Sequence, residues 1–277
     1  MGGNTYWSQV ELYSPDGNCQ HELAKINVSQ SEPFLAYINE KIISCGGHGK
    51  KDCFVYNIAE DKWSLLTSYS YTHDYEPAAS YDNKLYIADD TNPEVYDPVA
   101  STWSSWPVTP KQLGEGPCMV AWHDDFLLIG GRKSDNGVQR YSHATQAWNI
   151  VESSSAPMIV DFSGCLVLPT DEVLVVGAED PDIAGIAAAL YNVTANTWTK
   201  LDDTQWSHHG VSLVQLGQRV FALGSRDQNV VEEFHYNNNT WTTLDDGLIV
   251  HRTGHQDVLS LPADLFQHLP GGCVGVQ

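Results

Sequence analysis

The chain has 277 residues, with 35 acidic against 14 basic side chains and a formal net charge of −21 at pH 7. This acidity disfavours binding to nucleic acid and to anionic membrane surfaces. No apolar run is long enough to cross a bilayer, and the first residues, MGGNTYW, lack the apolar core of a signal peptide. We expect one domain over residues 1–277, with no membrane insertion.

Short apolar segments recur along the chain and predict β-strands, because they are rich in β-branched residues and bounded by Gly, Asp or Asn. They cover residues 41–45, 84–88, 125–129, 172–176 and 219–223. Two small residues follow most of them, and a glycine there permits positive φ and close backbone approach. The doublets are Gly46-Gly47, Gly130-Gly131, Gly177-Ala178 and Gly224-Ser225, whereas Asp89-Asp90 follows the second segment.

Each of these doublets is followed by an aromatic residue and, seven positions later, a tryptophan. The tryptophans recur at intervals of 40, 45, 50 and 43 residues, which indicates a repeat architecture. Each pair brackets a polar, turn-prone stretch and supplies apolar area between neighbouring units. The pairs are Tyr56/Trp63, Tyr96/Trp103, Tyr141/Trp148, Tyr191/Trp198 and Phe234/Trp241.

A sixth copy of the apolar segment ends at Gly271-Gly272 and has no aromatic pair after it. The missing half matches the N-terminal segment 8–20, where Tyr13 takes the first aromatic position and Gln20 replaces the tryptophan. A last unit shared between the two termini would close a ring by strand pairing and leave no open sheet edge.

In these features the chain resembles the kelch family of β-propellers, over essentially its whole length. The resemblance implies six or seven blades of four antiparallel strands around a central channel. The doublets number six, at residues 46, 89, 130, 177, 224 and 271. We therefore expect an all-β, six-bladed kelch-type propeller whose last blade is closed by the N- and C-terminal segments. We expect no adaptor domain before it, and so no role as an intact ubiquitin-ligase substrate adaptor.

The cysteines and glycosylation sequons leave the compartment open, with a mild lean to a secreted, extracellular protein over a cytoplasmic one. Cys45 and Cys53 flank a loop between two predicted strands, so a cross-strand disulfide is conceivable. In a chain of this length six buried thiols are slightly favoured over disulfides. The remaining cysteines are Cys19, Cys118, Cys165 and Cys273, and the sequons, about as many as chance gives, stand at Asn27, Asn192 and Asn238.

The resemblance places recognition on one face of the ring, in two sets of loops. One set follows the doublets, and the other leads into the innermost strand of each blade. The candidate ligand-binding residues in these loops are Glu32, His48, His73, Tyr75, Arg132, Trp206, His208, His209, Arg226, Arg252, His255 and Asp257.

Histidines are frequent in the second set, so a metal site or an acid–base site is an alternative. His208, His209 and His255 come from adjacent predicted blades and could face one end of the channel. Hydrogen bonding that holds the loops is favoured about three to one, because no motif with fixed ligand spacing supports chemistry. No nucleophile or phosphate-binding motif occurs either. We expect no catalytic residue, no metal and no cofactor.

We therefore expect a non-enzymatic binding module that recognises a protein or another ligand, of undetermined oligomeric state. One alternative is a carrier of a small apolar or aromatic, pigment-like ligand, which an exposed pair of Trp106 and Trp206 would indicate. Trp7 and Trp122 also fall outside the repeat.

A second alternative is an enzyme that resembles kelch-type sugar epimerases. It would act at the channel mouth and would need a charged pair there, such as Glu32 with Arg252 or His255. Copper-dependent kelch oxidases would need a Cys–Tyr cross-link and two histidine ligands, which nothing in this chain matches residue by residue.

Overall fold

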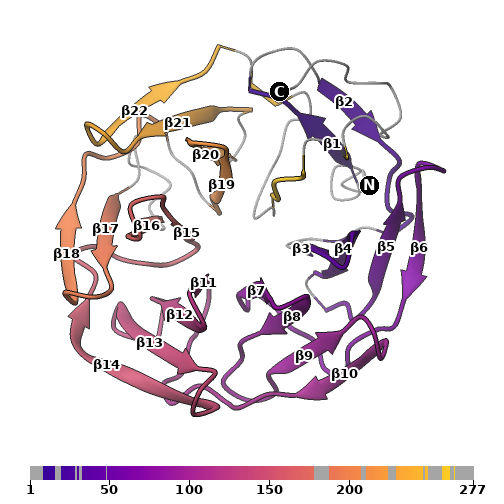
Figure 1. Ribbon diagram of the computed structural model, residues 1–277, viewed down its shortest axis with the longest axis horizontal. Helices are drawn as coiled ribbons and strands as arrows, with labels where there is room; N and C mark the ends of the chain where they lie inside the picture. Colours follow the sequence, from indigo (N-terminus) through magenta and orange to yellow (C-terminus); the bar gives the residue numbers. More distant parts are fainter. Residues whose placement is uncertain are drawn as a thin grey trace, which may run out of the picture.

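A computed structural model describes residues 9–15, 20–28, 30, 33–47, 49–177, 187–206, 210–223, 229–245, 247–248, 258–262 and 265. Their strands form a ring of antiparallel sheets, as Figure 1 shows. Five sheets have four strands each, and a sixth has two. No helix in this described part is long and apolar enough to cross a membrane.

The four-stranded sheets follow one another along the chain, and in each the first strand is innermost (Figure 1). Blade 1 is β3 (Pro33–Ile38), β4 (Lys41–Gly46), β5 (Cys53–Asn57) and β6 (Lys62–Leu66). Blade 2 is β7 (Ala78–Tyr81), β8 (Lys84–Ile87), β9 (Glu94–Asp97) and β10 (Thr102–Ser105). Blade 3 is β11 (Cys118–Trp122), β12 (Asp125–Ile129), β13 (Gly137–Ser142) and β14 (Ala147–Ser155). Blade 4 is β15 (Gly164–Val167), β16 (Val173–Val176), β17 (Ala188–Asn192) and β18 (Thr197–Lys200). Blade 5 is β19 (Ser212–Leu216), β20 (Arg219–Leu223), β21 (Val231–His235) and β22 (Thr240–Thr243).

The prediction of six four-stranded blades is corrected to five among the described residues. Among the described strands, the sixth sector of the ring holds β1 (Val10–Tyr13) and β2 (Gln20–Leu23), paired in an antiparallel hairpin (Figure 1). This hairpin is the N-terminal half of the predicted split blade. Of the C-terminal half, before Gly271-Gly272, the structure describes Leu265 alone, which is not in a strand. The two-stranded sheet is therefore the part of the sixth unit that the structure shows.

The aromatic pairs of the repeat are direct cross-strand neighbours on the third and fourth strands of each blade. In blade 4, for example, Tyr191 lies opposite Trp198 with ring centroids 4.7 Å apart. The other four pairs have the same register, with centroids at 4.9–5.5 Å. The seven-residue spacing thus arises from a short hairpin between two adjacent strands.

Most of these tryptophans also connect one sheet to the sheet before it. The Nε1 of Trp103 donates a hydrogen bond to the backbone oxygen of Thr67, just after the outermost strand of blade 1, at 2.9 Å. Equivalent bonds join Trp63 to Ala24, Trp148 to Pro107 and Trp198 to Ser154. A buried indole N–H needs such a partner, so the repeat tryptophans stabilise the contacts between blades.

The Gly130-Gly131 doublet of blade 3 shows why two small residues end the second strand. Their φ angles are 74° and 96°, and a Cβ on them would overlap Val160 and Leu113, respectively. Blade 2 tolerates an aspartate doublet because neither Asp89 nor Asp90 has positive φ. The Asp89 carboxylate instead accepts the backbone N–H of Thr91 at 2.6 Å, which shapes the following turn.

The preference for six free thiols is wrong for the four cysteines that the structure describes. Cys45 and Cys53 lie directly opposite each other on β4 and β5 and form a disulfide, with Cα atoms 4.0 Å apart. Cys118 and Cys165 join the innermost strands of blades 3 and 4, with Cα atoms 5.7 Å apart. In both pairs the fold brings the backbones within bonding reach. Cys19 and Cys273 lie outside the described residues.

Candidate functional site

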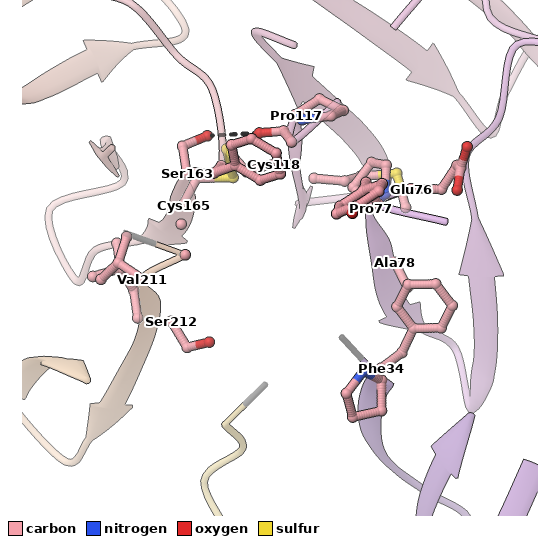
Figure 2. A pocket seen from close by; sticks show the side chains of 18 residues that line it. Phe34, Glu76, Pro77, Ala78, Pro117, Cys118, Ser163, Cys165, Val211 and Ser212 are labelled. Carbon is pink, nitrogen blue, oxygen red and sulfur yellow. Dashed lines mark hydrogen bonds between the residues drawn. A yellow bond between two sulfur atoms is a disulfide. The ribbon is translucent and has the colours of Figure 1, made fainter. Parts of the chain in front are cut away.

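The segments that lead into the five innermost strands meet at one end of the ring and line a cavity of about 240 Å³ (Figure 2). We call this the mouth cavity, and the side of the ring that carries it the mouth face. Because strands alternate in direction, the start of the first strand and the end of the second lie on the same face of each blade. The lining residues fall within 33–34, 75–78, 116–119, 162–165 and 210–213.

The structure thus brings the two predicted loop sets together where both are described. In blade 3 the backbone N–H of Arg132, just after the doublet, donates to Glu115 O at 3.1 Å in the segment leading into β11. The N–H of Gly131 donates to Val160 O at 2.8 Å, in the segment leading into β15. In blade 1 the N–H of Gly49 donates to the Asp74 carboxylate at 2.7 Å.

The wall of the mouth cavity mixes apolar and polar groups in about equal measure. Phe34, Met119 and Phe162 line it, together with the Cys118–Cys165 disulfide. Its polar side chains include Tyr75, Ser163 and Ser212, and Figure 2 shows the Ser212 hydroxyl pointing into the space between the strands. A cavity of this size fits one group of side-chain size, and the rings of Phe34 and Phe162 give an aromatic group apolar surface to pack against.

Glu76 is the one charged residue among the described residues of the lining, and its carboxyl group points away from the cavity (Figure 2). Its Oε2 is buried, with no hydrogen-bond partner among the described residues. Burial, reinforced by the nearby carboxylates of Asp89, Asp74 and Asp90, raises the pKa of Glu76 to about 8. The side chain therefore holds a proton at neutral pH and adds no negative charge to the wall.

Arg132 lies at the rim of the mouth face, where two acidic residues hold it. Its Nε donates to Asp161 Oδ2 at 2.9 Å and its Nη1 to Glu115 Oε2 at 2.6 Å. The guanidinium also lies 5.4 Å from the ring centroid of Phe162, within cation–π range. The hydrogen bond to Asp161 is the largest cause that raises the pKa of Arg132. This rim can orient a polar group that borders an apolar group seated in the cavity.

His73 is almost completely buried and belongs to an internal polar cluster. Its Nδ1 lies 3.1 Å from Asp89 Oδ2, and its Nε2 lies 3.2 Å from Glu94 Oε2. Glu94 also accepts the backbone N–H groups of Ser70 and Tyr71 from the segment after blade 1. The cluster therefore holds the segment between blades 1 and 2 against the β8–β9 part of blade 2, and His73 does not line the mouth cavity.

Burial alone would raise the pKa of Asp89, but hydrogen bonds from His73, Thr91 and Asn92 outweigh it and lower the pKa to about 2. Asp89 is therefore a carboxylate at neutral pH. Over the described part of the chain, no group of three or more His, Cys, Asp or Glu side chains is arranged to hold a metal ion.

The sequence-based candidates that the structure describes fall at four different places. Tyr75 lines the mouth cavity, Arg132 lies at its rim, and His73 is internal. Trp206 is 39% exposed and lies farther out on the mouth face, where its Nε1 donates to Thr243 Oγ1 at 3.0 Å. The other candidates lie outside the described residues: Glu32, His48, His208, His209, Arg226, Arg252, His255 and Asp257.

The exposed Trp106–Trp206 pair that a pigment carrier would present is absent from the described surface. Trp106 is 7% exposed and packs between blades 2 and 3, with its ring centroid 4.8 Å from Tyr141 and 5.1 Å from Trp148. Trp122 is also buried, and it donates to Asp171 Oδ1 at 3.1 Å. Trp7 lies outside the described residues.

Sequence reasoning missed three contributors to the site: Phe162, Ser212 and the Cys118–Cys165 disulfide. All three lie within a few residues of the start of an innermost strand, as Tyr75 does. The repeat register predicts those positions, but a search for charged and histidine side chains passes over apolar residues and serines. The useful signal was therefore position within the repeat rather than residue type.

The chain is similar in sequence to two curated kelch-like proteins. It is 25% identical to human Kelch-like protein 30 over 109 residues, which cover 39% of this chain and 18% of that protein. It is 21% identical to Kelch-like protein 25 of Xenopus tropicalis over 252 residues, which cover 81% of this chain and 42% of that protein. The chain thus spans less than half the length of either relative. No family model matches it.

Solved structures show the same fold. One is a fungal alcohol oxidase in complex with copper, which superimposes with a TM-score of 0.63 at 15% identity. The superposition covers 88% of this chain and 60% of the oxidase. At this identity the likeness concerns the fold alone. In its doublets, its in-register aromatic pairs and its similarity to two kelch-like proteins, the chain is a β-propeller that resembles the kelch-repeat family.

Proposed function

We propose that the chain is a non-enzymatic binding module that takes an apolar or aromatic side chain of a protein partner into the mouth cavity. The observation that carries this proposal is the convergence of five lead-in segments on one small cavity with Phe34, Met119 and Phe162 in its wall. An anchor residue buried in a pocket of that size is the usual energetic centre of a protein interface.

The rim of the cavity adds the polar part of such an interface. Arg132 lies beside Phe162 and forms ion pairs with Glu115 and Asp161. When these ion pairs rearrange, its guanidinium can donate hydrogen bonds to a carbonyl or carboxylate of the partner. The net charge of −21 favours a partner that is neutral or basic over an acidic one. We therefore expect recognition to combine an apolar anchor with a neutral or basic surround.

The described residues support an oxidase-like or an epimerase-like enzyme less than they support a binding module. All four described cysteines are in disulfides, so none of them is available for a Cys–Tyr cross-link. The charged pairs that an epimerase-like site would use, Glu32 with Arg252 or His255, lie outside the described residues. The carrier alternative retains Trp206 as an exposed aromatic residue but lacks the expected second one.

The proposal is tested with a variant that fills the cavity. Ser212→Trp places a large side chain where Ser212 points into the open space (Figure 2). Glu60→Trp is the matched control, because Glu60 is exposed in the β5–β6 turn on the opposite face. The wild-type chain and both variants serve as bait in an extract of the native source, with captured proteins quantified by mass spectrometry.

We expect at least one protein to be captured by the wild type and by Glu60→Trp, and to be lost with Ser212→Trp. Circular dichroism and thermal unfolding confirm that each bait is folded. Equal capture by Ser212→Trp and Glu60→Trp would show that binding does not use the mouth cavity.

A further inference from the structure

The sequon at Asn238 lies at the tip of an outer hairpin of the ring. Asn238 is exposed in the turn that joins β21 to β22, the two outermost strands of blade 5 (Figure 1). The hydroxyl of Thr240, the third residue of the sequon, donates to the Asn238 side-chain oxygen at 2.9 Å. Asparagine and threonine of the sequon are therefore side by side on an accessible turn.

The fold does not require an asparagine at this position. Counting from the aromatic residue of each repeat, the residues equivalent to Asn238 are Glu60, Ala100, Thr145 and Ala195, and all four are exposed. The residue two positions later is exposed in all five blades as well. A branched sugar on the exposed Asn238 side chain would thus extend into solvent from the face opposite the mouth cavity, at the outer edge of blade 5.

The asparagine at position 192, which starts a second sequon, has a structural role in its turn that the asparagine at position 238 does not have. Its side-chain oxygen accepts the backbone N–H of Ala195 at 2.9 Å and shapes the turn between β17 and β18. Asn57 and Asp97 do the same at the equivalent position of blades 1 and 2. The hairpin therefore explains Asn192 without any modification, whereas it does not explain Asn238.

The disulfides provide an independent observation about the compartment. All four described cysteines are paired, one pair within blade 1 and one between blades 3 and 4. Disulfides of this structural kind form and persist in oxidising compartments and are rare in the cytosol. Asparagine-linked glycosylation takes place along the same secretory route, and its acceptors lie on surface loops.

We propose that the chain matures in an oxidising secretory compartment and carries an N-linked glycan on Asn238. In that reaction the Asn238 Nδ2 forms a bond to the anomeric carbon of an oligosaccharide. The donor is an oligosaccharide linked to a lipid pyrophosphate, whose sugar–oxygen bond breaks as the lipid pyrophosphate leaves, and Nδ2 loses a proton. This modification is separate from the mouth cavity and does not depend on the proposed binding function.

The first test uses the protein purified from its native source. Peptide-N-glycosidase treatment in H₂¹⁸O converts a glycosylated asparagine into an ¹⁸O-labelled aspartate, which peptide mass spectrometry locates. We expect the label at residue 238. An unlabelled, unmodified Asn238 peptide throughout the sample would overturn the proposal. Alkylation without reduction provides a second measurement: Cys45, Cys53, Cys118 and Cys165 should react only after reduction, and free thiols at these positions would refute the oxidising compartment.

The second test uses full-length variants secreted from a eukaryotic host. Asn238→Gln and Thr240→Ala should each remove the mass of one glycan, whereas Thr240→Ser should retain it. Asn237→Gln is the matched control, since Asn237 is exposed in the same turn but starts no sequon. A glycan mass that persists in Asn238→Gln and Thr240→Ala would place modification elsewhere and contradict the assignment.

Discussion

Replacing Glu76 with glutamine should remove a pH dependence of stability that the wild-type chain shows between about pH 4.5 and 8. The Glu76 carboxyl group is partly buried near Asp89, and its pKa is raised from 4.5 to about 8. In that range the folded chain keeps a proton that the unfolded chain has released, so folding becomes less favourable as pH rises. Between these two pH values, each unit rise in pH lowers the free energy of unfolding by about 1.4 kcal/mol, and the total loss is at most about 5 kcal/mol.

Because part of the side chain is exposed, solvent screening should reduce the observed effect to about 2–3 kcal/mol. Urea unfolding followed by tryptophan fluorescence at pH 4.5, 6, 7 and 9 measures it. Glu76→Gln should match the wild type at pH 4.5 and exceed its stability at pH 9. Glu60→Gln, an exposed control, should follow the wild-type curve. If the wild type and Glu76→Gln keep a constant difference over the whole range, the assigned burial and charge environment of Glu76 is wrong.

Three further substitutions test the packing between blades. Asp89→Asn should lower the free energy of unfolding by about 2 kcal/mol at pH 7 and leave it unchanged near pH 2, which urea unfolding at both pH values checks. The reason is that the Asp89 carboxylate has a lowered pKa in the folded chain, so it stabilises the fold above pH 3.8 and loses this effect as pH falls towards 2. Trp103→Phe should cost about 1–2 kcal/mol, measured by thermal unfolding, because the Thr67 carbonyl loses its donor. Gly130→Ala should cost about 2 kcal/mol or more in the same assay, because φ is 74° and the added Cβ would overlap Val160; an unchanged Tm would refute that close approach.

The architecture could be predicted from the sequence because each repeat contains residues whose spacing reflects how its strands pair. The seven-residue spacing of Tyr191 and Trp198, for example, corresponds to a direct cross-strand pair. The segment with Tyr13 and Gln20 was likewise predicted to be half a unit, and it forms a two-stranded hairpin. Five blades are complete among the described residues instead of the predicted six, and the doublet of the sixth unit, Gly271-Gly272, lies outside those residues.

The site was less accessible to sequence reasoning. His73 is a polar residue in the segment that leads into blade 2, but its burial beside Asp89 and Glu94 depends on how that segment folds back on the blade, which spacing does not reveal. Trp106 falls outside the aromatic pairs, yet it fills the space beside Trp148. The thiol state also depended on three-dimensional proximity, since the two paired cysteines of blades 3 and 4 are 47 residues apart in sequence.

Hydrogen–deuterium exchange of the chain with its captured partner tests the central claim most directly, namely that the mouth face is the binding surface. Exchange is compared between the free and bound chain for peptides over 33–34, 75–78, 116–119, 162–165 and 210–213, which line the cavity. We predict that protection on binding concentrates in these segments and in the loop that carries Arg132. Protection confined to the β5–β6 and β13–β14 turns of the opposite face, with none around the cavity, would contradict the account.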